Sequence, residues 1–130
     1  MIKKILIVED DPFTQQFYNY FFAKTSYEAI ITEDGAEIIS RLKNDNISLL
    51  LLDINLKNTY LNDKKTDGVE IAKYIRGNEE INQVPIILVT AYQDKIGNEK
   101  AFDRTIADDY ILKPLSDFDE LLTKIEKTIA

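Results

Sequence analysis

Three short apolar runs in this chain end on a charged residue, and this pattern limits the folds that the chain can adopt. The runs are residues 5–8 before Glu9, residues 49–52 before Asp53, and residues 110–112 before Lys113. Short apolar runs closed by a charge are typical of buried parallel strands whose carboxyl ends reach water. Because parallel strands end at one edge of their sheet, these charged side chains are expected to meet there, where open α/β folds bind ligands.

Strand-like and helix-like patterns alternate from one end of the chain to the other. Strands are expected at residues 4–8, 28–32, 47–53, 86–89 and 109–112. Helices are expected from Pro12, over residues 36–44, 69–76 and 94–104, and from Ser116, whose role as N-cap is supported by Asp119. Five strands alternating with five helices predict one α/β domain over residues 1–130, with a doubly wound parallel sheet and no output domain.

The first helix carries several aromatic residues, and their spacing divides them between two faces. Four of them are expected to share one face: Phe13, Phe17, Tyr20 and Phe21. Tyr18 and Phe22 are expected to lie well round from that face. They would form either a docking patch for a partner or two of the scattered exposed aromatics that are normal on a protein surface.

The composition excludes several classes of chemistry. The chain has 130 residues, 45% of them hydrophobic, which is enough to bury the core of one ordinary domain. It has no cysteine and no histidine. Thiolate metal sites, cysteine nucleophiles and the Ser-His and Cys-His catalytic pairs are therefore excluded. Any chemistry must use carboxylates, hydroxyls, lysines and hard cations.

The charge and hydropathy of the chain bear on its partners and its location. A net charge of −7 is expected to repel nucleic acid and anionic membranes. No apolar run in the sequence approaches the roughly 20 residues that span a bilayer. Met1 leads almost directly into a strand, which leaves no room for a signal peptide. We therefore expect a soluble cytoplasmic domain that binds neither nucleic acid nor membrane.

The acidic residues at the strand ends predict a cation site. Glu9, Asp10 and Asp53 would place several negative charges in a small volume, which requires a counter-charge. Their hard oxygen atoms suit Mg²⁺, Lys113 offers a second positive charge, and Thr90 offers a hydroxyl at the end of the fourth strand. An aspartate in such surroundings is equipped to accept a phosphoryl group. Asp53 is the better candidate because its strand is the most apolar.

Each of these features has an ordinary structural explanation when it is taken alone. Acidic residues after a strand commonly cap helices or form turns, and a lysine-proline pair commonly ends a strand. Their joint occurrence in this order, each at the carboxyl end of a strand, favours the functional interpretation.

The chain resembles a response-regulator receiver domain of two-component signalling over essentially its whole length. The resemblance rests on five motifs: Ile5-Leu6-Ile7-Val8-Glu9-Asp10-Asp11, Leu52-Asp53-Ile54, Asp67-Gly68, Val89-Thr90-Ala91 and Tyr110-Ile111-Leu112-Lys113-Pro114. It implies a flavodoxin-like (βα)5 fold with strand order 2-1-3-4-5. It also implies a signalling switch, and not an enzyme with an outside substrate, whose partner is a sensor histidine kinase or a histidine phosphotransfer protein.

The resemblance implies a role for each matching residue. Asp53 would accept a phosphoryl group from a phosphohistidine of the kinase. Glu9, Asp10 and Asp53 would hold Mg²⁺, with Asp10 as a direct ligand, and Asn55 would add its backbone carbonyl. The remaining three residues would respond to the phosphoryl group: Thr90 and Lys113 by contacting it, and Tyr110 by turning inward as the switch.

The segment between Asp53 and Gly68 departs from the family pattern. It is longer than is usual in the family, and it lacks the proline commonly found just after the acceptor. Residues 57–67 are either a tolerated surface insertion, since added loop length costs little, or a flap over the phosphorylation site that slows hydrolysis or selects the kinase.

Three other functions are compatible with parts of this pattern. A pseudo-receiver would share the fold and bind partners without accepting phosphate, which the retained acidic, hydroxyl and lysine residues disfavour. A haloacid-dehalogenase-like phosphatase would need a second aspartate two positions after its nucleophile, where this chain has Asn55. A nucleotide-binding Rossmann domain would need a glycine-rich loop after the first strand, which this sequence lacks.

Overall fold

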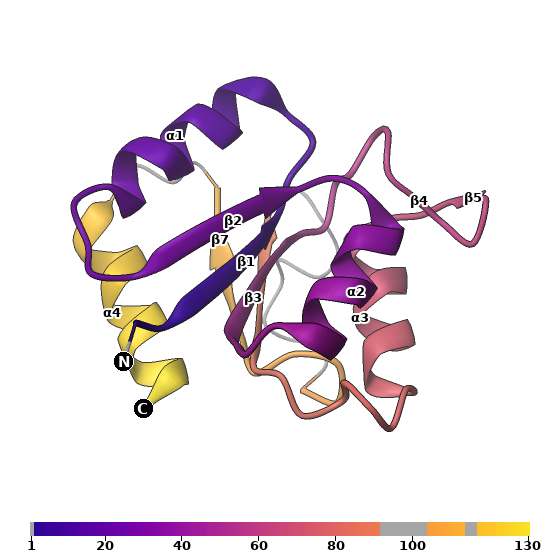
Figure 1. Ribbon diagram of the computed structural model, residues 1–130. Coiled ribbons are helices and arrows are strands. Elements are labelled where there is room, and N and C mark those ends of the chain that lie inside the picture. The colour runs from indigo at the N-terminus through magenta and orange to yellow at the C-terminus, as the bar shows by residue number, and fades with distance from the viewer. Residues whose placement is uncertain (1, 92–103, 114–116) are drawn as a thin grey trace.

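The computed structural model describes residues 2–91, 104–113 and 117–130. A five-stranded sheet forms its centre, with helices on both faces and a small two-stranded hairpin beside it (Figure 1). The sheet strands are β1 (Lys4–Val8), β2 (Glu28–Thr32), β3 (Ile47–Asp53), β6 (Ile86–Thr90) and β7 (Asp109–Leu112). The hairpin strands are β4 (Tyr60–Leu61) and β5 (Lys64–Lys65). The helices of the described residues are α1 (Pro12–Phe22), α2 (Gly35–Asn44), α3 (Gly68–Arg76) and α4 (Phe118–Ile129).

The strand order of the sheet is β2-β1-β3-β6-β7, and each pair of neighbours is parallel. This confirms the predicted order 2-1-3-4-5, because β6 and β7 are the fourth and fifth strands of the sheet once the hairpin is set aside. The chain runs outward from β1 to β2 and then returns to place β3 on the other side of β1. The order therefore reverses between β1 and β3, which is where folds of this kind bind ligands.

Alternate residues of the strands point to opposite faces of the sheet and belong to two hydrophobic cores, one on each face. On β3, Leu50 and Leu52 pack with Ile38 and other side chains of α2 and α3. Leu49 and Leu51 point the other way and pack with the side chains of α1 and α4. Figure 1 shows α1 and α4 on one face of the sheet and α2 and α3 on the opposite face. The nearly continuous apolar sequence of β3 follows from this burial on both sides.

Helix α1 buries a different face from the one expected. Tyr18, Phe21 and Phe22 are buried, whereas Phe13 is 82% exposed and Tyr20 is 60% exposed. The buried three have the i, i+3, i+4 spacing of a single helical stripe. The prediction that Tyr18 and Phe22 lie away from the core is therefore wrong, and they do not form a docking patch. Aromatic residues occur on both sides of this helix, so their spacing alone did not identify the buried stripe.

An aspartate caps each of the four helices in the described residues by accepting a hydrogen bond from a backbone N–H of the first turn. The capping residues are Asp11, Asp34, Asp67 and Asp117. The cap of α4 was predicted at Ser116, but it lies one residue later, because the Asp117 carboxylate accepts the N–H of Glu120 at 3.0 Å. The helix predicted over residues 94–104 lies outside the described residues except for Arg104, which lies in a turn.

The long segment after β3 contains the β4–β5 hairpin, which the sequence did not predict. Its strands pair antiparallel in this register: Tyr60 opposite Lys65 and Leu61 opposite Lys64. Asn62 and Asp63 form the two-residue turn, with φ values of 54° and 66°. Positive φ at both central residues is the geometry of a type I′ turn, which asparagine and aspartate tolerate better than most residues.

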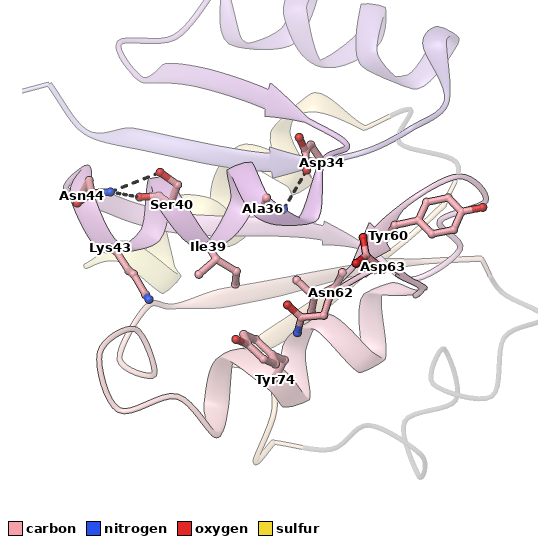
Figure 2. A pocket seen from close by; sticks show the side chains of 11 residues that line it. Asp34, Ala36, Ile39, Ser40, Lys43, Asn44, Tyr60, Asn62, Asp63 and Tyr74 are labelled. Atoms are coloured by element: carbon pink, nitrogen blue, oxygen red, sulfur yellow. Dashed lines mark hydrogen bonds between the residues drawn. The ribbon is translucent and has the colours of Figure 1, made fainter.

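The hairpin packs against the start of α2. A Cβ atom added at Gly35 would lie 2.1 Å from the carbonyl oxygen of Tyr60, so only glycine permits this approach. A groove of about 610 Å³ runs between α2, the hairpin and α3, and Figure 2 shows Ile39 of α2 and Tyr74 of α3 among the residues that line it. The insertion is therefore a folded element docked on the domain.

Candidate functional site

The carboxyl edge of the sheet brings together residues that are far apart in the sequence. Glu9 directly follows β1, while Asp53 and Thr90 are the last residues of β3 and β6. Lys113 follows β7, and its backbone N–H donates to the carbonyl of Thr90 at 2.7 Å. This hydrogen bond keeps the end of β7 beside the end of β6, so the Lys113 side chain starts close to the other three residues.

Asp53 is a buried carboxylate with a positive partner. Its side chain is 3% exposed, and the ammonium nitrogen of Lys113 lies 3.1 Å from both Oδ1 and Oδ2. The backbone N–H of Asn55 also donates to Oδ1 at 3.1 Å. Burying an ionised carboxylate is costly unless it is paired and hydrogen-bonded, and these contacts meet both requirements.

Glu9 is a buried carboxylate without such a partner. Its Oε2 accepts the backbone N–H of Asp11 at 3.1 Å, whereas its buried Oε1 has no hydrogen-bond partner among the described residues. Burial and, secondly, the negative charge of Asp53 raise the pKa of Glu9 to about 8. A carboxylate in this position is stabilised by binding either a proton or a cation.

Asp10 is held by the beginning of the long segment after β3. Its Oδ2 accepts three hydrogen bonds: from the backbone N–H groups of Lys57 and Asn58, both at 2.7 Å, and from Thr59 Oγ1 at 3.2 Å. In the described part of the chain, no three acidic side chains converge closely enough to form a ready-made metal site. Asp10 is therefore present at the predicted edge of the sheet, but it is bound to the segment that follows Asp53.

The predicted switch residues lie on the neighbouring strands β6 and β7. Thr90 is fully buried, and its hydroxyl donates to the carbonyl of Ala91 at 3.2 Å. Tyr110 pairs in register with Leu88, and its partly buried ring packs against the core on the α2 and α3 face. The ammonium of Lys124 lies 5.8 Å from the centre of that ring.

Gly68 gives the Asp67-Gly68 motif a physical explanation. A Cβ atom added at Gly68 would lie 2.2 Å from the carbonyl oxygen of Asp53 and 2.7 Å from Ile54 Cα. The Gly68 N–H also donates to the carbonyl of Ile54 at 3.1 Å. Glycine is therefore required for α3 to begin directly against the strand end that carries Asp53.

Two features of this site were missed from the sequence. The first is the set of contacts that residues 57–59 make with Asp10. The second is Tyr18, whose pKa is raised well above its usual value by burial and, to a lesser extent, by the charges of Glu9 and Asp53. Tyr18 is therefore close enough to Glu9 and Asp53 for their charges to affect it. The helical spacing of Tyr18 from Phe21 and Phe22 was the sequence pattern that could have predicted its burial.

The geometry of the strand ends agrees with the comparison to known families. Residues 5–126 match the family model of the response regulator receiver domain. This chain belongs to the response regulator receiver family. Receiver domains are signalling modules of two-component systems that receive phosphoryl groups from histidine kinases. Among the described residues of this receiver domain, no helix has the length and apolar character needed to cross a membrane.

Individual relatives agree with this family and with the fold. The polar-differentiation response regulator DivK of Brucella ovis is 30% identical over 116 residues, which cover 89% of this receiver domain and 88% of DivK. The receiver domain of a sensor histidine kinase from Pseudomonas aeruginosa was solved with a magnesium ion coordinated in its active site cleft. It is 25% identical, with a TM-score of 0.79 over 99% of this chain and 98% of its own. A CheY-like receiver domain protein from Methanospirillum hungatei is 26% identical, with a TM-score of 0.78 over 99% of this chain and 94% of its own.

Proposed function

We propose that this receiver domain is a phosphorylation switch whose acceptor is Asp53. The phosphoryl donor would be a phosphohistidine of a sensor histidine kinase or of a histidine phosphotransfer protein. The observation that carries the proposal is the contact between the buried carboxylate of Asp53 and the Lys113 ammonium at 3.1 Å. An acceptor oxygen with a cation already beside it is suited to receive an anionic group.

The transfer is a displacement at phosphorus. A carboxylate oxygen of Asp53 attacks the phosphorus atom, a P–O bond forms, and the P–N bond to the imidazole breaks with its electron pair returning to nitrogen. Little covalent chemistry is required of the protein, so its contribution is positioning and charge stabilisation. Lys113 neutralises the phosphoryl oxygens, and the hydroxyl of Thr90 contacts one of them from the neighbouring strand end.

The side chains at this edge also suit Mg²⁺. Glu9, Asp10 and Asp53 supply the hard oxygen atoms that this ion prefers, and the backbone carbonyl of Asn55 would add a fourth. The buried Oε1 of Glu9 has no hydrogen-bond partner in the part of the chain that the structure describes, and a nearby cation would offset the cost of burying it. When bound, Mg²⁺ supplies positive charge that offsets the charge of the phosphoryl group and of the acidic residues.

The readout of phosphorylation would pass through Thr90 and Tyr110. An added phosphoryl group brings about −1.5 to −2 charges and new hydrogen-bond acceptors, which draw the Thr90 hydroxyl toward Asp53. Tyr110 then turns inward, and the surface formed by β7 and α4 changes its preference for a downstream protein. Phosphorylation shifts this equilibrium only by its differential interaction with the two states.

Phosphorylation of the purified chain tests the proposal. We expect that incubation with Mg²⁺ and acetyl phosphate adds one phosphoryl group, detected by intact mass, and that Asp53→Asn abolishes the addition. Asp63→Asn, which changes an exposed aspartate in the hairpin turn, is the matched control and should be modified like the wild type. A wild-type chain that stays unmodified would overturn the proposal and favour a pseudo-receiver that binds partners without phosphate.

A further inference from the structure

The segment after Asp53 uses three donors on one oxygen of Asp10. The N–H groups of Lys57 and Asn58 lie 2.7 Å from Oδ2, and the hydroxyl of Thr59 lies 3.2 Å from it. Among the described residues, every hydrogen bond to this carboxylate ends on Oδ2. A carboxylate oxygen offers about two lone pairs, so the three donors together saturate Oδ2.

The three donors are fixed by the fold of the hairpin behind them. Thr59 is fully buried, and its carbonyl accepts the N–H of Thr66 at 2.9 Å across the base of the hairpin. The backbone of Tyr60, the next residue, lies so close to Gly35 of α2 that no residue larger than glycine fits at position 35. The donors therefore do not need to be ordered when they bind Asp10, which makes their hold on the carboxylate stronger.

The hydrogen bonds between residues 57–59 and Asp10 affect the proposed cation site. Glu9 and Asp53 are close enough for the charge of Asp53 to raise the pKa of Glu9, yet the described residues contain no three acidic side chains gathered to hold a metal. The resemblance to the family implies that Asp10 is a direct ligand of Mg²⁺, and here its carboxylate is bound to the insertion. A metal that binds this carboxylate through Oδ2 must first displace the hydrogen bonds of residues 57–59.

We propose that residues 57–59 form a latch that holds Asp10 in the metal-free protein and lowers the affinity of the site for Mg²⁺. This inference rests on the proposed function, because it concerns the same cation site. The latch acts through Asp10, so Thr59 and the N–H of Lys57 are positioning groups. Binding of Mg²⁺ through Oδ2 would release the latch, and the start of the insertion would then separate from Asp10.

Direct measurement of Mg²⁺ affinity by calorimetry tests the latch. Thr59→Val keeps the shape of the side chain and removes its hydroxyl donor, while Lys57→Pro removes a backbone donor. We expect each variant to bind Mg²⁺ about threefold to tenfold more tightly than the wild type, which is the change expected for the loss of one ordinary intramolecular hydrogen bond. Thr66→Val, on the same hairpin but without a contact to Asp10, is the control and should bind like the wild type.

The outcomes separate the latch from the cation site on which it rests. If the wild type and both variants fail to bind Mg²⁺, the proposed cation site is wrong. If all bind with equal affinity, or the variants bind more weakly, the latch is wrong and these hydrogen bonds support the ligand. Circular dichroism confirms that each variant is folded.

Hydrogen exchange gives a second readout that does not depend on substitution. In the wild type, saturation with Mg²⁺ should accelerate exchange of the Lys57 and Asn58 amide hydrogens, because their acceptor is removed. Unchanged protection of both amides at saturating Mg²⁺ would overturn the latch.

Discussion

The ammonium nitrogen of Lys113 lies 3.1 Å from both carboxylate oxygens of Asp53, although the two residues are 60 positions apart in the chain. Their strands are not neighbours, because β6 lies between β3 and β7 in the sheet. The contact therefore reaches across a strand end, and it depends on the parallel direction of all three strands. A single change of strand order would separate the acceptor from its counter-charge.

Removing the counter-charge should destabilise the domain through Asp53. We expect Lys113→Met to lower the free energy of unfolding by about 1–3 kcal/mol, because it leaves a buried carboxylate without its cation. Urea unfolding at neutral pH without Mg²⁺ measures this change. The cost should nearly vanish when Asp53→Asn is already present, and an equal cost in both backgrounds would show that Lys113 stabilises the fold by another route.

Glu9 should make the stability of the metal-free protein depend on pH. Its pKa is about 8 in the folded chain, against an ordinary value of 4.5. Between these values the folded state holds a proton that the unfolded state has lost, so stability falls as the pH rises. We expect Glu9→Gln to remove much of this decrease in stability. Histidine cannot account for the decrease, because the chain contains none. Melting temperatures between pH 5 and pH 8 test this, and parallel curves for the two proteins would contradict it.

Gly68→Ala should disturb the end of β3. Its added methyl group would lie 2.2 Å from the carbonyl oxygen of Asp53, so the strand end or α3 must move. We expect a loss of about 1–3 kcal/mol in the free energy of unfolding and slower phosphorylation by acetyl phosphate. Gly77→Ala is the matched control, because its nearest contacts would lie at 3.5 and 3.7 Å. Similar losses for both variants would show that close packing at Gly68 is not the cause.

Asp63→Gly should stabilise the hairpin. Asp63 has a φ of 66°, and this conformation is unfavourable for a residue with a Cβ atom. We expect a gain of up to about 1 kcal/mol, partly offset by the greater entropy of glycine in the unfolded chain. Asp63→Val should have the opposite effect, because a β-branched residue fits this conformation poorly. Thermal unfolding of the wild type and the two variants tests both expectations. A higher stability of Asp63→Val than of the wild type would contradict the turn geometry.

The sequence predicted the sheet and the cluster at its edge because both follow from local patterns. Apolar runs identify buried strands such as β3, and a parallel sheet necessarily gathers the residues that end its strands. The contacts of Asp10 could not be predicted in this way, since its donor Lys57 lies 47 positions away in an insertion without strand periodicity. The burial of Tyr18 was missed because α1 carries aromatic residues on both sides.

The hairpin adds two strand edges to the surface of the domain. Its strands are only two residues long, and β5 consists of two exposed lysines, Lys64 and Lys65. An open strand edge presents unpaired backbone groups that can recruit a strand from another chain, and short length and lysine charges both oppose such recruitment. The insertion therefore enlarges the domain without adding a strand edge that readily pairs with another chain.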